Sequence, residues 1–182
     1  METVLVTGFN GFIGSHLIPQ LIQKYNVVGL STSKNSQLKI SQIKTDITKI
    51  DKKILPSKIS KIIHLAAISD VDFCQKNPLD ASHINILGTQ KILELARKHD
   101  SQVVFISTSH VFGSQKTNPI DECCQKNPTS IYAATKLAGE SLCESYSNSY
   151  GLNIGVMRLF SVYGPNSPKH SVTTNIIKQI IS

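Results

Sequence analysis

The chain has 182 residues, a length that suits one domain with a sizeable core, and no apolar run in it approaches the roughly twenty residues that span a membrane. Its net charge of +7 comes largely from lysines scattered between residues 34 and 61 without interleaved aromatics, which indicates a solvated surface and no nucleic-acid partner. The four cysteines lack the spacing of a metal site or a disulfide framework, so we expect reduced thiols in a cytoplasmic protein without a metal. The chain starts on a core strand, so we expect no signal peptide, and we expect no membrane partner.

A strand, a glycine turn and a helix are expected at the start of the chain. Residues 4–7 are apolar or β-branched, and an apolar pattern of helical period begins at Ile13. Between them, Gly8 permits a sharp turn out of the strand, Gly11 lets the backbone approach a pyrophosphate, and Gly14 lets the helix pack on the strand. The N–H groups at the start of the helix would face the phosphates. The stretch therefore predicts a dinucleotide site.

The end of the second expected strand, residues 26–30, leaves the choice of dinucleotide open. A carboxylate usually follows this strand and binds the adenosine ribose, but here Ser31, Thr32, Ser33 and Lys34 follow it. Hydroxyls and a lysine can bind a ribose 2′-phosphate, and no carboxylate would repel it. Backbone groups can equally bind the unphosphorylated ribose. The cofactor is therefore expected to be NAD or NADP.

Strands and helices alternate over the rest of the chain. Further strands are expected at residues 42–45, 61–67, 102–107 and 153–159, and helices over residues 78–98 and 129–150. This alternation implies right-handed crossovers. It predicts an α/β fold with a Rossmann-type doubly wound parallel sheet in three α/β/α layers.

Side chains at the carboxyl ends of these strands are candidates for ligand contacts, because an open parallel sheet binds its ligands at that edge. Asp46 leaves the strand at 42–45, where its carboxylate either accepts a hydrogen bond from an adenine amino group or caps a turn. Ala66 and Ala67 end the strand at 61–67 and are small enough to let a ligand come close.

Tyr132 and Lys136 stand four residues apart, which places them on one face of a helix. A nearby ammonium group favours the phenolate, so we expect Lys136 to lower the pKa of Tyr132 and make it an acid or base near neutral pH. Hydroxyls at residues 107–109 end a neighbouring strand and would reach the same substrate oxygen.

Six motifs follow one another in order, at residues 7–14, 64–67, 85–89, 106–113, 132–136 and 158–165. In this order they resemble the extended short-chain dehydrogenase/reductases, especially the NAD-dependent epimerase/dehydratase group, which acts on nucleotide sugars. The resemblance implies that Thr108 holds the substrate oxygen, Tyr132 transfers its proton, and Lys136 binds the nicotinamide ribose and tunes Tyr132. A hydride would then pass between a sugar carbon and the nicotinamide ring.

The motifs and the strand ends together predict the cofactor contacts. These are Gly8, Asn10, Gly11, Phe12, Ile13, Gly14, Ser31, Lys34, Asp46, Ile47, Leu65, Ala66, Ala67, Ser107, Tyr132 and Lys136.

Two departures from the family pattern bear on the reaction. Ser109 and His110 occupy the positions where nucleotide-sugar 4,6-dehydratases carry an Asp-Glu pair, which disfavours dehydration. His110 is either an additional proton carrier or a hydrogen-bonded structural histidine. Ser161 replaces an Asn that contacts the nucleotide sugar in many epimerases, so the sugar stays open.

Members of the family usually continue into a smaller substrate domain. We therefore predict an NAD(P)-binding Rossmann domain over residues 1–165 and the start of a truncated substrate domain over residues 166–182. A helix is expected over residues 173–181. Its apolar residues would form an exposed patch, made of Ile176, Ile177, Ile180 and Ile181.

The expected function is that of a nucleotide-sugar oxidoreductase or epimerase with a nucleotide sugar as substrate. The alternative is a noncatalytic NAD(P)-binding module or an inactive fragment that lacks the substrate domain. A homodimer is expected by resemblance, through the helices at 78–98 and 129–150.

Overall fold

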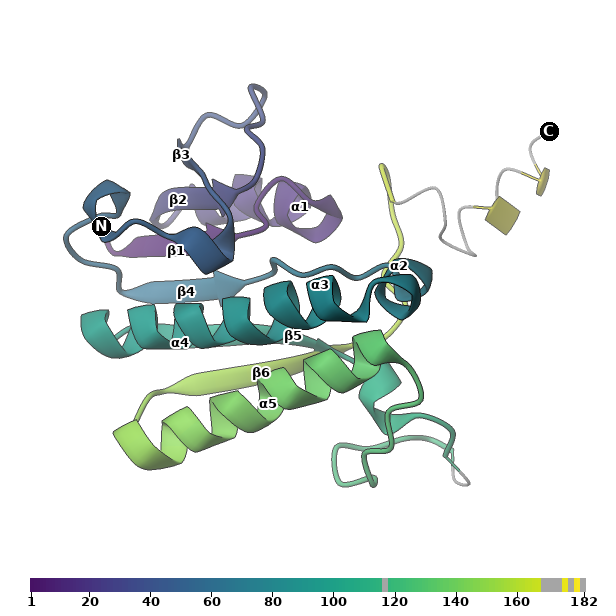
Figure 1. The fold of residues 1–182 in the computed structure, drawn as a ribbon. Helices are drawn as coiled ribbons and strands as arrows, with labels where there is room; N and C mark the ends of the chain where they lie inside the picture. The colour runs from purple at the N-terminus through teal and green to yellow at the C-terminus, as the bar shows by residue number, and fades with distance from the viewer. Residues whose placement is uncertain (116–117, 168–174, 177–178, 181–182) are drawn as a thin grey trace.

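The computed structural model describes residues 1–115, 118–167, 175–176 and 179–180. Its strands form one parallel sheet in the order β3-β2-β1-β4-β5-β6 (Figure 1). They are β1 (Thr3–Thr7), β2 (Asn26–Ser31), β3 (Ser41–Lys44), β4 (Lys61–His64), β5 (Gln102–Thr108) and β6 (Ile154–Leu159). The chain adds β2 and β3 on one side of β1 and then β4, β5 and β6 on the other side. This order confirms the doubly wound sheet that the alternation predicts.

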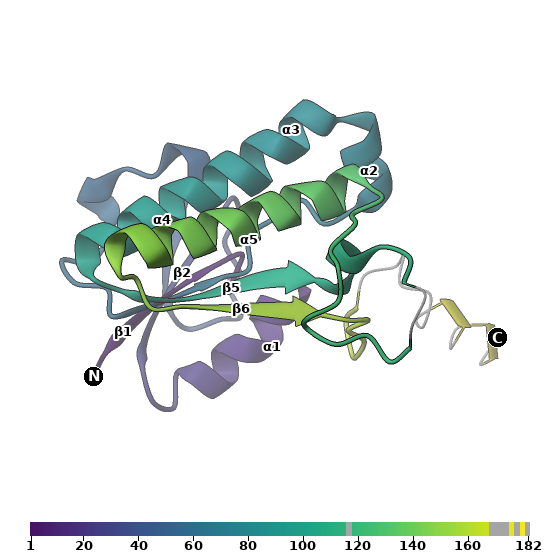
Figure 2. The same cartoon turned by 90° about the horizontal axis from the view of Figure 1, so that it is seen from below.

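Helices cover both faces of the sheet (Figure 2). On one side lies α1 (Phe12–Leu21). On the other side lie α3 (Pro78–Ser82), α4 (Gly88–His99) and α5 (Ile131–Tyr150), with the short α2 (Val71–Lys76) at their end. Short turns of helix cover His83–Leu87, which is a π-helix, and Ile47–Lys49, Lys52–Ile54 and Ser109–Phe112, which are 3₁₀-helices.

The alternation of side chains along β1 divides the core in two. Val4 and Val6 pack with Ile18 on the side of α1, whereas Leu5 packs with Leu93 on the side of α4 and α5. All five side chains are buried, because the central strand of a doubly wound sheet is covered on both faces. The core therefore holds the carboxyl end of β1, where the glycine turn begins, on both sides.

Most expected elements agree with the structure to within two residues, and two differ in kind or by more than that. The helix predicted over 78–98 consists of α3, the π-helical turn and α4 in one continuous run. The strand predicted over 61–67 ends at His64, because the N–H of Ala66 is bonded by the side chain of Thr7 at 3.1 Å and leaves the ladder. The segment α2 was not predicted; Asp70 caps it by accepting a hydrogen bond from the Phe73 N–H.

Of the helix predicted over 173–181, residues 175–176 and 179–180 are helical, and the rest lies outside the described residues. Ile176 and Ile180 are exposed, in agreement with the expected patch, whereas Ile177 and Ile181 fall outside the description. Every helix in the described part of the chain is too short or too polar to cross a bilayer. All four cysteines are free, and the cytoplasmic location stays a prediction.

Candidate active site

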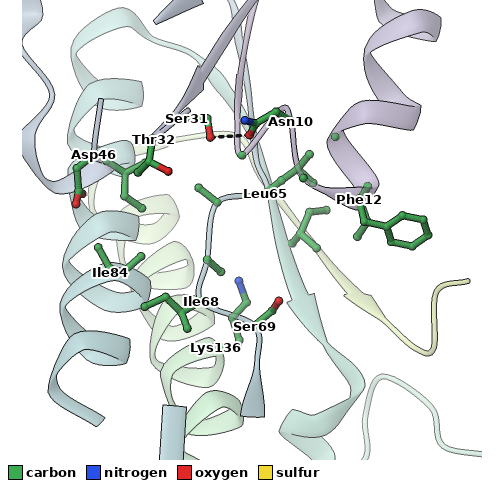
Figure 3. Close-up of a pocket in the computed structure, with 18 of the residues that line it drawn as sticks. Asn10, Phe12, Ser31, Thr32, Asp46, Leu65, Ile68, Ser69, Ile84 and Lys136 are labelled. Carbon is green, nitrogen blue, oxygen red and sulfur yellow. Dashed lines mark hydrogen bonds between the residues drawn. The ribbon is translucent and has the colours of Figure 1, made fainter. Parts of the chain in front are cut away.

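A cavity of about 570 Å³ lies at the carboxyl ends of β1, β2 and β4 (Figure 3). Every residue expected at the cofactor lines it except Lys34 and Ser107. Six further residues line it that are absent from the expected cofactor contacts: Thr32, Thr45, Ile68, Ser69, Ile84 and Ile106. The first four follow directly or within a few residues after the ends of β2, β3 and β4, so position relative to a strand end is the signal that would have found them.

The glycine turn at one wall of this cavity is built for a close backbone approach. Gly8 has a φ of 68°, and a Cβ there would lie 2.8 Å from the backbone N of Ala66. A Cβ at Gly14 would lie 2.5 Å from the carbonyl oxygen of Phe9. A Cβ at Gly11 would meet only the oxygen of Gly8, at 3.2 Å, so the cavity side of Gly11 is open. Only glycine fits the two packed positions, and the open one leaves space for a ligand.

The start of α1 faces the same cavity. Gly11 precedes the helix without a side-chain cap, and the first turn holds no acidic residue. The N–H groups and the positive end of the helix dipole are therefore turned toward the cavity that Gly11, Phe12 and Ile13 line. These features fit a dinucleotide pyrophosphate.

Asn10 ties the glycine turn to the end of β2. Its Oδ1 accepts a hydrogen bond from the Ser31 hydroxyl at 2.6 Å, the contact drawn in Figure 3. Its Nδ2 donates to the Ser33 hydroxyl at 2.7 Å and to the Ser33 carbonyl at 3.0 Å. Lys34, expected at the cofactor, is exposed and lies outside the cavity lining.

Asp46 lines the cavity and also caps a turn. Its Oδ1 accepts hydrogen bonds from the Thr48 N–H at 2.8 Å and from the Thr48 hydroxyl at 2.9 Å. The capping alternative is therefore observed, and the second carboxylate oxygen remains beside the cavity.

The residues proposed for proton transfer come from the end of β5 and the start of α5; Tyr132 and Lys136 line the other end of the cavity, whereas Thr108 is not among the lining residues. Thr108 ends β5, and its oxygen accepts a hydrogen bond from the His110 N–H at 3.2 Å. Burial raises the pKa of Tyr132 and a hydrogen bond from Thr108 opposes that rise, but the net shift is upward. The lowering expected from Lys136 is therefore wrong for this structure, because desolvation of the phenol outweighs the stabilisation of its anion.

Lys136 is itself buried, with 4% of its surface exposed. Its Nζ lies 4.2 Å from the centre of the Phe105 ring, and Figure 3 shows the nitrogen turned toward the cavity. Burial lowers the pKa of Lys136 to about 8, although Cys143 and Glu140 oppose the shift. The ammonium group is thus held at the cavity on an aromatic face.

His110 stacks edge-on against Tyr132, with ring centroids 6.2 Å apart and an angle of 76° between the planes. The His110 side chain is exposed. Ser161, which departs from the family pattern, is also exposed and does not line the cavity.

Ser107 serves a support network instead of the cofactor site. Its hydroxyl donates to Glu140 at 2.6 Å, and Arg158 donates to both oxygens of the same carboxylate at 2.9 Å. Lys126 lies 3.1 Å from it. Because Glu140 follows Lys136 by one helical turn, this network holds α5 to β5 and β6 directly behind the lysine.

A second network runs under the cavity from β1 to α4. The Thr89 hydroxyl donates to the Asn85 carbonyl at 2.6 Å, so its oxygen must accept the bond from His64 Nε2 at 3.1 Å. His64 Nδ1 then accepts from the Thr7 hydroxyl at 2.7 Å, and that oxygen accepts from the Ala66 N–H. Burial lowers the pKa of His64 to about 3, with a smaller contribution from the charge of Lys136, so this histidine is neutral.

The same network continues to the start of α5. Asn85, in the π-helical turn, donates from Nδ2 to the Ile68 carbonyl and to the Thr135 hydroxyl, both at 2.9 Å. Thr135 in turn donates to the Tyr132 carbonyl at 2.8 Å. An uninterrupted chain of hydrogen bonds therefore joins the glycine turn to Tyr132. The spacing of the motifs did not predict it.

Residues 4–182 match the profile of the NAD dependent epimerase/dehydratase family. Among curated proteins, the chain is 37% identical to the "Uncharacterized UDP-glucose epimerase YtcB" of Bacillus subtilis, over 97% of this chain and 61% of that protein. It is 36% identical to the "Putative UDP-glucose 4-epimerase" of Methanocaldococcus jannaschii, over 88% of this chain and 56% of that protein.

Solved structures give the same relationship. A UDP-N-acetylglucosamine 4-epimerase from Methanobrevibacter ruminantium superposes with a TM-score of 0.90 at 32% identity, over 99% of this chain and 63% of that one. The UDP-glucuronic acid 4-epimerase from Bacillus cereus, in complex with UDP-glucuronic acid and NAD, superposes with a TM-score of 0.88 at 32% identity, over 98% and 63%. The chain thus spans about 60% of the length of these relatives. By the matched residues, the identities and the fold, it belongs to the NAD dependent epimerase/dehydratase family.

Proposed function

We propose that this chain forms the cofactor-binding and catalytic part of a nucleotide-sugar epimerase or reductase. The observation that carries the proposal is the position of Tyr132 and Lys136, which line one end of a cavity whose other end fits a dinucleotide pyrophosphate. The 4-epimerases among the relatives act on nucleotide sugars according to their names. A nucleotide sugar is therefore the proposed substrate.

We assign some residues of the cavity to cofactor binding and others to proton transfer. Gly11 and the start of α1 would hold the pyrophosphate, and Asp46 would lie beside the adenine. A bound nicotinamide dinucleotide supplies the acceptor and donor of hydride. The protein places the sugar carbon within reach of it.

We assign proton transfer to side chains at the end of β5 and the start of α5. The raised pKa of Tyr132 keeps the phenol protonated at neutral pH, so it is ready to donate a proton to a keto oxygen. Thr108 donates a hydrogen bond to the phenol oxygen and stabilises the phenolate left behind. Lys136, with a pKa of about 8, is mostly charged at neutral pH and favours the same product.

The substitution Tyr132→Phe tests this assignment. Removing the phenol oxygen should lower turnover of a nucleotide sugar by roughly 10²-fold to 10⁴-fold, because phenylalanine transfers no proton. The variant should still bind the dinucleotide: the rise in melting temperature on binding should stay within twofold of the rise in the wild type. NMR of the sugar carbon after incubation with UDP-glucose or UDP-glucuronic acid measures the turnover. An undiminished rate in the variant would contradict the proposal.

A noncatalytic dinucleotide-binding module is the second candidate. The chain spans about 60% of the relatives' length, so cofactor binding and turnover are measured separately on it. Binding of NAD or NADP without turnover of either nucleotide sugar would support it. Turnover by the 182-residue chain would exclude it.

We also propose that residues 1–165 are the dinucleotide-binding domain and that residues 166–182 begin a substrate domain. The segment after β6 supports this division, because Phe160, Val162 and Tyr163 are large apolar residues with 45% to 68% of their surface exposed. Such a patch is typical of a surface that another segment covers. Proteolysis that cuts between the two parts and leaves a folded piece ending near residue 165 would support the boundary.

A homodimer through α3, α4 and α5 completes the proposal. These helices lie side by side on one face of the sheet (Figure 2), and Leu79 on that face is 84% exposed. Two such faces can form a helical bundle across a two-fold axis. Sedimentation at micromolar concentration should give a dimer, and Leu79→Glu should shift it to the monomer. A monomeric wild-type chain would count against it.

A further inference from the structure

Phe105 is a buried aromatic residue of β5 that takes no part in the proposed proton transfer. Its side chain is 1% exposed and does not line the cavity. The ammonium nitrogen of Lys136, which does line the cavity, lies 4.2 Å from the centre of the Phe105 ring. We propose that Phe105 is a positioning residue whose ring face holds the Lys136 ammonium group at the cavity, and that Gly139 makes room for this ring. The inference rests on the proposed function only in giving Lys136 a task at the cavity.

The ring is the contact that fixes the charged end of Lys136. A lysine side chain has a long flexible stem, so its ammonium group takes a defined position only where something holds it. Among the residues that the structure describes, no hydrogen bond or ion pair to Lys136 Nζ is present. A cation is attracted to the negative face of an aromatic ring, most strongly where water is excluded. Lys136 is 4% exposed, so water screens this attraction little.

Gly139 determines where the ring lies under the helix. It follows Lys136 by three residues on α5, and both residues are buried. A Cβ at Gly139 would lie 2.5 Å from Cζ of Phe105 and 3.2 Å and 3.3 Å from its two Cε atoms. Since Cζ is nearest and the Cε atoms are almost equally distant, the ring points its far end at Gly139. The missing Cβ therefore lets the ring reach under α5, where Lys136 lies over it.

The other titratable groups near Lys136 carry no charge that could replace this contact. His64, on β4, has its ring centre 5.8 Å from that of Phe105, and burial lowers its pKa to about 3, so it is neutral. Burial also raises the pKa of the Cys143 thiol to about 12 and raises the pKa of Tyr132. Both of these groups are therefore protonated and uncharged at neutral pH.

Glu140 carries a charge of opposite sign one helical turn after Lys136, but other cations bind it. Arg158 donates to both of its oxygens at 2.9 Å, and Lys126 lies 3.1 Å from it. Burial lowers the pKa of Lys136 more than Cys143 and Glu140 raise it. The face of Phe105 thus remains as the direct partner of the ammonium group.

NMR of the 182-residue chain, labelled with ¹³C at the lysine Cε atoms, tests the contact in the wild type. Protons over the face of an aromatic ring resonate upfield, so the Hε signals of Lys136 should lie upfield of those of the exposed lysines. The spectrum of Lys136→Met identifies these signals by their loss. Signals of Lys136 at the position of the exposed lysines would overturn the inference.

A change confined to the electrons of the ring separates attraction from packing. Difluorophenylalanine at position 105, with its fluorines on the two Cδ atoms, nearly keeps the shape of the ring and leaves unaltered the end that faces Gly139. The fluorines weaken the negative face. Losing about half of such a contact should lower the pKa of Lys136 from about 8 by roughly 0.2–0.7, measured by NMR titration of the labelled lysine.

Phe112 provides the matched control for this replacement. It is 2% exposed, and its ring centre lies 5.1 Å from the guanidinium carbon of Arg158. Difluorophenylalanine at position 112 should leave the pKa of Lys136 unchanged. If the replacement at position 105 leaves that pKa unchanged or raises it, the inference is overturned, because the ring then only packs or excludes water. An equal fall in both proteins would also overturn it.

Gly139→Ala tests the second part of the inference. The added Cβ meets the far end of a side chain, so we expect the ring to shift and the chain to fold. The upfield position of the Lys136 signals should then be lost, and NAD should bind severalfold more weakly in calorimetric titration. Gly155→Ala, with nothing within 4 Å of its Cβ, should change neither.

The outcomes separate this inference from the proposed function. Unshifted Lys136 signals in Gly139→Ala, or shifted signals with unchanged NAD affinity, would overturn the inference. The fluorine replacement requires no movement of the ring, so it decides the inference even where Gly139→Ala does not fold. If the wild type binds neither NAD nor NADP, the proposed function fails, whereas the NMR measurements on Lys136 still decide the inference.

Discussion

Replacing Glu140 by glutamine removes a negative charge from a side chain that is only 4% exposed. Arg158 and Lys126 then keep positive charges that face a neutral amide, and the Ser107 hydroxyl loses its charged acceptor. Breaking a buried ion pair on one side costs about 3–5 kcal/mol. Because Arg158 and Lys126 retain some solvent contact, we expect the lower end, about 3 kcal/mol, or a fall in melting temperature of roughly 6–12 °C.

Urea unfolding at neutral pH measures this loss, and Glu2→Gln is its matched control. Glu2 pairs with Lys61 at 2.6 Å, but the two side chains are 54% and 29% exposed, so its loss should cost less than about 1 kcal/mol. Equal, small losses in the two variants would refute the reasoning.

Acidification adds a second check on Glu140. Burial alone would raise the pKa of Glu140, but hydrogen bonds from Arg158, Ser107 and Lys126 outweigh it and the pKa is lowered. The carboxylate therefore contributes stability above its unfolded pKa, about 4.3, and loses that contribution as the pH falls through the folded value. The stability difference between wild type and Glu140→Gln should disappear in acid. A difference that persists there would have another cause.

Three further predictions follow from particular contacts. Gly14→Ala would place a Cβ 2.5 Å from the carbonyl oxygen of Phe9, so it should cost roughly 1–3 kcal/mol in urea unfolding and abolish dinucleotide binding, whereas Gly155→Ala, with nothing within 4 Å, should change neither. The folded pKa of Lys136, about 8, lies below its unfolded value of 10.5, so the buried ammonium group destabilises the fold at neutral pH. Lys136→Met should therefore raise the free energy of unfolding at neutral pH, measured with urea, by up to roughly 3 kcal/mol. This gain should shrink as the pH rises from 8 to 10.5, because the wild-type lysine then loses its proton in the folded state. His64, with a folded pKa of about 3, should make wild type lose stability as the pH falls below 6.5, and urea unfolding of His64→Gln should show a shallower loss.

Local patterns in the sequence predicted those parts of the site that depend on chain direction. The glycines at 8, 11 and 14 require a strand before them and a helix after them, and the structure has both. Ala66 and Ala67 follow a parallel strand, so the sheet edge that they line could be predicted without knowing their neighbours. The same rule, extended to each strand end, accounts for Thr32 and Thr45 as well.

Interactions that join distant segments could not be predicted in this way. The hydroxyl of Ser107 lies near the carboxyl end of β5, as expected, but it donates to Glu140, 33 residues away in the sequence. No spacing of residue types predicts that bond. Burial raises the pKa of Tyr132 and outweighs the hydrogen bond from Thr108, and the sequence shows the charge of Lys136 but not the burial. Helical spacing therefore predicted that Tyr132 and Lys136 lie at one cavity, but it predicted the wrong direction for the pKa of Tyr132.

The two polar networks explain why the cofactor half of the site can be tested on this chain. One runs from Thr7 through His64 and Asn85 to the start of α5, and the other holds Glu140, one turn after Lys136, to Arg158 on β6. Among the described residues, no buried side-chain nitrogen or oxygen lacks a hydrogen-bond partner. Both ends of the cavity are thus fixed by contacts among residues 7–158, none of which needs the further length that the relatives have. Failure of this chain to bind a dinucleotide would therefore count against the proposed site itself.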